Sequence, residues 1–263
     1  MINIDKVNGT NKSQVIDFIK QDVIKHVFAF YDIQYDPEHT TVHAAFENNQ
    51  LIGYILIYTA ADVPSIVIES EKRATGALLE HAPENNIILH APPELLTTIK
   101  AKYPTEKHYV ENWMLVRKNE ANFFKSEFVK PLHTRDDALS LSKLLSTRKD
   151  RPEKAIEKYV EWVKKMRLYG VFEDGELVSY AGSFLQLPQV WMIGGVYTNP
   201  KHRNKGYATL AVSAITEEAL GKAETAALFV RSDNYPAIKS YEKIGYKKIG
   251  EKLWVDVGTG MRP

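Results

Sequence analysis

The hydrophobic positions of the second half of the chain change from a helical to a strand-like period. Residues 135–148 and 152–167 carry apolar side chains three and four positions apart, and each stretch predicts an amphipathic helix. The next two apolar runs, 170–174 and 177–185, flank the turn dipeptide Asp174-Gly175 and predict a β-hairpin.

The remaining pattern alternates strands with helices. Residues 190–197 and 226–230 predict strands, and residues 207–220 between them predict a helix. A second helix is expected from Pro236 to Gly245, because proline suits a first helical turn and glycine suits a helix end. Residues 246–257 are expected to form a final pair of strands. The order predicts a mixed α/β (α+β) domain with a mixed sheet.

The first half of the chain repeats this plan in weaker form. Residues 48–54 match 173–180 as a turn that enters a strand, and residues 87–103 match 228–246 as a strand followed by a helix. Both halves also end on a short run closed by tryptophan, Trp113 and Trp254. We therefore predict two related domains in tandem, with non-superposable halves as the outcome that would refute the duplication.

The domains are predicted at 1–125 and 126–263. The first lacks one feature of the second, because residues 69–79 contain no counterpart of the glycine loop near residue 206. We expect it to be degenerate, and to pack against the second domain, close one side of a substrate cleft or contribute to homodimer contacts.

Composition excludes several function classes. Net charge is +1, with no basic stripe for nucleic acid and no apolar run long enough for a membrane span. Cysteine is absent, and the eight histidines have no ligand spacing, so we expect neither thiol chemistry nor a metal. The N-terminus lacks the pattern of a signal peptide, which favours a cytoplasmic location.

The loop between the strand 190–197 and the helix 207–220 is the main candidate for binding chemistry. It contains Arg203, Lys205 and Gly206, and Ala208 opens the helix. A helix start offers unpaired N–H groups and partial positive charge, and small residues let a phosphate approach the backbone. The alternative from the residues alone is a basic surface turn.

Two motifs together resemble those of the GNAT acetyltransferase superfamily. Arg203-x-x-Gly206-x-Ala208 resembles its pyrophosphate loop, and the run from Asn234 to Tyr246, with Ala237, Tyr241 and Gly245, resembles its second signature. The resemblance covers residues 128–258. The sequence of residues 193–198, Ile-Gly-Gly-Val-Tyr-Thr, also resembles the glycine N-acyltransferase-like branch of this superfamily.

The resemblance implies acetyl-CoA, or another acyl-CoA, as co-substrate, held where the strands 190–197 and 226–230 diverge. It implies Tyr241 as the general acid that protonates the departing sulfur while an amine attacks the thioester. The implied cofactor contacts are Val196, Tyr197, Thr198, Arg203, Asn204, Lys205, Gly206, Tyr207, Ala208, Thr209 and Asn234.

No general base is evident. Many members of the family carry a glutamate on the strand before the loop, where this chain has Gly194 and Gly195. Glu173, Glu176 and Asp233 are better explained as turn or cap residues, and we assign none of them. The two glycines could instead leave room for substrate.

The acceptor is expected to be a small-molecule amine or an amino acid. Aromatic side chains near the predicted cleft are Tyr180, Phe184, Trp191 and Tyr197, of which only some can face it. One alternative keeps the fold without catalysis, as a CoA-binding regulatory or scaffold protein. A nucleotide loop of a kinase or dehydrogenase is disfavoured, because neither Gly-Lys-Ser/Thr nor Gly-x-Gly-x-x-Gly is present.

Overall fold

The computed structural model describes residues 1–104, 106–148 and 154–260. Within these residues no helix is long and apolar enough to cross a membrane. The packing divides the chain into two compact units, the first made of Met1–Glu111 with Glu251–Pro263 and the second of Asn112–Gly250. The predicted domain boundary at residue 125 stays a prediction.

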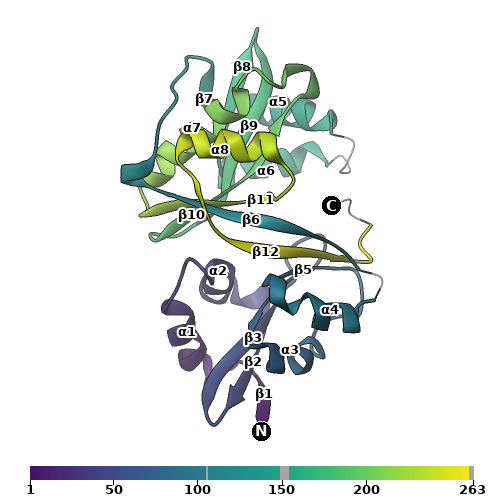
Figure 1. Ribbon diagram of the computed structural model, residues 1–263. Coiled ribbons are helices and arrows are strands. Elements are labelled where there is room, and N and C mark those ends of the chain that lie inside the picture. The colour runs from purple at the N-terminus through teal and green to yellow at the C-terminus, as the bar shows by residue number, and fades with distance from the viewer. Residues whose placement is uncertain (105, 149–153, 261–263) are drawn as a thin grey trace. The chain divides into compact units, whose positions relative to one another are not determined.

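The two halves of the sequence have the same succession of elements, labelled in Figure 1. The first half contains β1 (Ile2–Lys6), α1 (Lys12–Lys20), α2 (Val27–Tyr35), β2 (Thr40–Glu47), β3 (Gln50–Tyr58), β4 (Ser65–Ser70), α3 (Lys72–Leu79), β5 (Ile87–Ala91), α4 (Leu96–Lys102) and β6 (Lys107–Arg117). The second half contains β7 (Val129–Pro131), α5 (Arg135–Ser146), α6 (Ile156–Lys165), β8 (Arg167–Glu173), β9 (Glu176–Gln186), β10 (Val190–Thr198), α7 (Tyr207–Leu220), β11 (Thr225–Arg231), α8 (Tyr235–Ile244) and β12 (Lys247–Val257). The predicted mixed α/β fold in two related copies is confirmed.

Most predicted elements of the second half are present. The helix expected at 207–220 has these bounds in α7, and the hairpin around Asp174-Gly175 is β8–β9. The predicted start of α6 at Pro152 lies outside the described residues. The prediction of a final pair of strands was wrong. Residues 247–257 form the single strand β12, which runs through Gly250 without a break.

The last strand of each sequence repeat lies in the sheet of the other unit. The strand order is β1-β2-β3-β4-β5-β12 in the first unit and β6-β11-β10-β9-β8-β7 in the second. Leu253, Val255 and Val257 of β12 thus belong to the buried core of the first unit, and Met114 and Val116 of β6 to that of the second. The first unit therefore needs a strand from the far end of the sequence, and the second unit needs the strand that ends the first repeat.

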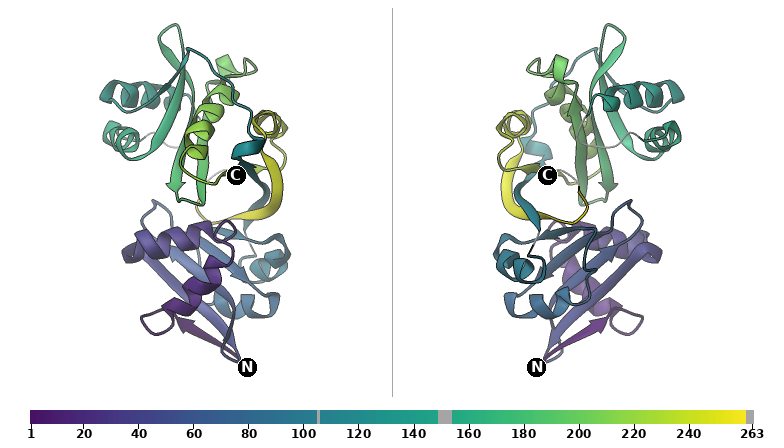
Figure 2. Two further views of the ribbon diagram at one scale, coloured as in Figure 1. Left: turned by 90° about the vertical axis from the view of Figure 1, so that its left-hand side faces the viewer. Right: turned by 90° about the vertical axis from the view of Figure 1, so that its right-hand side faces the viewer.

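Two hydrophobic cores cover the two faces of the second unit's sheet. The helices α7 and α8 pack on one face, where Ala211, Ile215 and Ile244 meet Val178 of β9. The helices α5 and α6 pack on the other face, where Leu141 and Val163 join a separate cluster. Figure 2 shows the α5–α6 pair and α7 on opposite sides of the strands. This sandwich fixes α7 and α8 relative to β10, and these elements carry the candidate site.

The strand exchange predicts which part of the protein the C-terminal strand stabilises. Leu253 is 1% exposed in the core of the first unit, so Leu253→Ala should destabilise that unit by about 3 kcal/mol, typical of a buried leucine. Amide hydrogen exchange should then accelerate in β3–β5 more than in β8–β11. Ile249→Ala, at a position of the same strand that is 49% exposed, is the matched control. Faster exchange confined to β8–β11 would contradict the exchange of strands.

Candidate functional site

The strands β10 and β11 pair only along their first halves. Their parallel register runs from Val190 opposite Thr225 to Ile193 opposite Leu228 and then stops. On the other side of β10, the register with β9 shifts just after Gly194, which gives β10 one extra residue. Gly195 lies in this bulge with a φ of +67°. The bulge marks the point where β10 leaves β11, so the diverging strand pair implied by the resemblance is present.

The space beside the two glycines is filled by aromatic rings. A Cβ atom on Gly194 would lie 2.8 Å from a ring carbon of Phe184, and one on Gly195 would lie 3.0 Å from the Tyr180 hydroxyl oxygen. The hypothesis that these glycines leave room for substrate is therefore wrong. They are needed because the bulge requires a positive φ and because Phe184 and Tyr180 pack closely against the strand.

The loop after β10 ends in a helix start that has no side-chain cap. Gly206 has a φ of 84° at the N-cap of α7, and the backbone hydrogen bond from Leu210 N–H to the Gly206 carbonyl oxygen (3.1 Å) opens the helix. The N–H groups of Tyr207, Ala208 and Thr209 precede that bond and have no partner within the helix. Glycine supplies no side chain to cap them, and an uncapped helix start of this kind is chemically suited to an anion.

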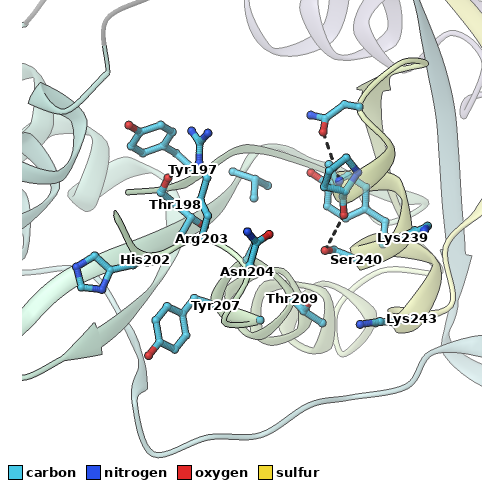
Figure 3. Close-up of a pocket in the computed structure, with 17 residues that line it drawn as sticks. Tyr197, Thr198, His202, Arg203, Asn204, Tyr207, Thr209, Lys239, Ser240 and Lys243 are labelled. Carbon is cyan, nitrogen blue, oxygen red and sulfur yellow. Dashed lines mark hydrogen bonds between the residues drawn. The ribbon is translucent and has the colours of Figure 1, made fainter. Parts of the chain in front are cut away.

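A pocket of about 610 Å³ lies between this loop and α8 (Figure 3). Its lining combines the end of β10, the loop, the first turn of α7 and one side of α8. The lining residues are Val196, Tyr197, Thr198, His202, Arg203, Asn204, Gly206, Tyr207, Ala208, Thr209, Asn234, Pro236, Ala237, Lys239, Ser240, Tyr241 and Lys243. The set includes every predicted site residue except Lys205, and it contains no aspartate or glutamate.

Glu173, at the end of β8, ties the loop to the β8–β9 hairpin. Its carboxylate lies 2.6 Å from His202 Nδ1, accepts hydrogen bonds from Lys205 Nζ at 3.0 and 3.2 Å, and accepts another from the Tyr207 hydroxyl. Bonds from Tyr207, Lys205 and His202 lower the pKa of Glu173 to about 2. Lys205 therefore binds a carboxylate and lies outside the pocket lining, and Glu173 is too weak a base for proton abstraction.

Tyr241 reaches the pocket from α8, which is held at both ends. The Asn234 side chain accepts a hydrogen bond from Ala237 N–H at 3.4 Å, and Gly245 ends the helix with a φ of 107°. Tyr241 is 6% exposed, packs edge-on against Tyr246, and has its pKa raised to about 12 by burial. The phenol is consequently protonated at any physiological pH. The same contacts show that Asn234 has a structural role as a helix cap.

Sequence reasoning missed two basic residues of the pocket, Lys239 and Lys243. They lie four residues apart on α8, so they share one side of the helix with the pocket-lining Ser240 and Pro236 nearby. The i, i+4 spacing was the available signal. Without the position of α8 opposite the loop, it could not be distinguished from an ordinary solvated face.

The contacts of Glu173 predict a role in holding the loop. Glu173→Gln removes the charge that three donors share, so amide exchange should accelerate in residues 199–206 but not within the strands β8 and β9. Hydrogen exchange followed by mass spectrometry measures this.

Glu176→Gln, a charge-matched change at the other side of the same turn, should leave the loop unchanged. Equal exchange in the two variants would show that Glu173 does not order the loop.

The comparisons with known proteins agree with this geometry. The FR47-like protein family model matches residues 168–255, and no curated protein sequence matches the chain. A Drosophila protein has a similar structure at 13% identity, with 97% of this chain and 98% of that chain covered and a TM-score of 0.76. A GCN5-related N-acetyltransferase from Sphaerobacter thermophilus has a TM-score of 0.65 at 12% identity, with coverage of 100% and 96%.

A tandem GNAT protein from the clavulanic acid biosynthesis pathway is similar over the whole length of both chains, with a TM-score of 0.61 at 12% identity. At such identities the likeness concerns the fold alone. The chain therefore has the GNAT acetyltransferase fold in a tandem arrangement, as the two motifs indicated. The more specific resemblance to the glycine N-acyltransferase-like branch is not confirmed.

Proposed function

We propose that this protein is an acyl-CoA-dependent N-acyltransferase that moves an acetyl or other acyl group to a primary amine of a small molecule or amino acid. One observation carries the proposal. A single pocket combines an uncapped helix N-terminus, a lining without carboxylates and a buried, protonated tyrosine. The first two features suit a polyanion, and the third suits a leaving group that gains negative charge.

The residues of the pocket fit an acyl-CoA. The N–H groups of Tyr207, Ala208 and Thr209 would hold the pyrophosphate, with Arg203 beside them. Val196 and Thr198 lie on the part of β10 that no longer pairs with β11, so their strand edge would bind the amide groups of the pantetheine arm. Asn204 and Asn234 would donate side-chain amide hydrogens to the same ligand.

In the reaction, the amine nitrogen bonds to the thioester carbon, the carbon–sulfur bond breaks, and the amine loses a proton. Tyr241 takes the general-acid position and donates a hydrogen bond from its phenol to the sulfur as charge develops there. Its pKa of about 12 lies well above the roughly 8.5 of a thiol. Complete transfer of the proton is therefore unfavourable, and the main contribution of Tyr241 is a strong hydrogen bond to the leaving sulfur.

The pocket supplies no carboxylate base. Its lining contains no aspartate or glutamate, and Glu173 is held ionised by three donors. The amine therefore enters neutral and releases its proton to water after attack. The cytoplasmic location and the homodimer contacts stay predictions.

Removal of the Tyr241 hydroxyl tests the catalytic role. With acetyl-CoA and a panel of primary amines, Tyr241→Phe should lower kcat about 100-fold, the lower end for loss of a general acid. The dissociation constant of acetyl-CoA should not change. Release of CoA can be followed with a thiol reagent without background, because the protein contains no cysteine.

The dependence of activity on pH tests whether Tyr241 stays protonated during catalysis. Burial raises the pKa of Tyr241 to about 12, so activity should rise as the amine deprotonates and should not fall again up to pH 10.

Tyr246→Phe is the matched control for Tyr241→Phe, because it also removes a buried tyrosine hydroxyl, in this case one bonded to Thr216. An unchanged kcat in Tyr241→Phe would show that the Tyr241 hydroxyl has no catalytic role. Tight binding without CoA release from any amine would favour the non-catalytic CoA-binding protein.

A further inference from the structure

Two ammonium groups face the pocket, and neither has a partner within the part of the chain that the structure describes. Lys239 and Lys243 line it from α8, and no ion pair or hydrogen bond of either ammonium group is described within residues 1–104, 106–148 and 154–260. Both side chains are exposed at the rim. Their charges are therefore available to a ligand.

The other cations of the pocket region are already engaged. Lys205 and His202 bind Glu173, and Arg203 Nε donates to the Thr198 carbonyl oxygen at 3.4 Å. In Figure 3 the two lysines lie on α8, across the pocket from Arg203 and His202. The pocket thus has two separate positive regions, the start of α7 with Arg203 and the rim formed by Lys239 and Lys243.

We propose that Lys239 and Lys243 form a second anion subsite, which binds the 3′-phosphate of the CoA nucleotide and selects CoA thioesters over thioesters that lack this group. The inference rests on the proposed function, since it assigns the other end of the same ligand. A phosphomonoester carries a charge of about −1.5 to −2 at pH 7, so it requires more than one cation. Lysine ammonium groups bind phosphate as compact point charges on flexible stems, which suits an open rim.

A cycle of two ligands and two proteins tests the subsite. Acetyl-CoA and acetyl-3′-dephospho-CoA are titrated by calorimetry into the wild-type protein and into Lys239→Gln/Lys243→Gln. Because partly solvated charge pairs contribute modestly, the double variant should bind acetyl-CoA about tenfold more weakly. Its affinity for the dephosphorylated ligand should change by less than about twofold.

Lys158→Gln/Lys165→Gln controls for the change in net charge. Both residues pair with Glu161 on α6 and do not line the pocket, so this variant should bind both ligands as the wild type does. Equal weakening of both ligands by the α8 variant would overturn the subsite in favour of general attraction. Equal affinity of the wild type for the two ligands would also overturn it. If the wild type binds neither ligand, the proposed function itself fails.

Discussion

The termination of β10–β11 pairing at Ile193 and Leu228 is the constraint on which the candidate site depends. The extra residue at Gly195 bends β10 at this point, because a bulge increases local twist and ends regular pairing. If the two strands paired to their ends, their backbone groups would satisfy one another and no pocket would separate them. Instead the end of β10 keeps a free edge beside the start of α7, so backbone donors and acceptors from two elements face one space.

In the first unit, buried charged side chains lie past the point where the corresponding strands stop pairing. Its parallel strands β4 and β5 also stop pairing early, at Val67 opposite His90. Beyond that point Glu69 is 3% exposed and is paired with Lys252 of β12, and Lys25 lies 3.7 Å from the same carboxylate. A buried charge needs such partners, so these side chains must remain together.

The first unit also lacks a loop at the corresponding position. Only Glu71 separates β4 from α3, whereas residues 199–206 separate β10 from α7. An eight-residue connection in the second unit gives space for a left-handed glycine and for the contacts with Glu173. This difference in the connection favours the second unit as the location of the proposed acyl-CoA pocket.

Local sequence signals predicted the parts of the site that are built locally. Gly206 and the apolar face after it defined α7, and Pro236 with Gly245 defined α8, because helix starts and ends depend on neighbouring residues. The convergence of the loop and Tyr241 on one pocket could be predicted only through the resemblance to GNAT proteins.

Contacts distant in sequence were not predictable. Glu173 is 34 positions from Tyr207, so its three donors were visible only in the fold. The rings of Phe184 and Tyr180 fill the space beside the glycine pair from a neighbouring strand, which no local pattern indicates. The exchange of β6 and β12 was hidden for another reason. Each strand follows its own repeat in sequence, and residues 246–257 were expected to form a pair of strands with each other.

The most direct test of the central claim is calorimetric titration of acetyl-CoA into the wild type and Ala208→Glu. The substitution places an acid in the first turn of α7, where it favours the helix but repels a phosphate at its N-terminus. Leu139→Glu, at an exposed position of α5, is the matched control. The account predicts one ligand per chain for the wild type and the control, and at least about tenfold weaker binding to Ala208→Glu. Equal binding by all three proteins, or no binding by the wild type, would contradict it.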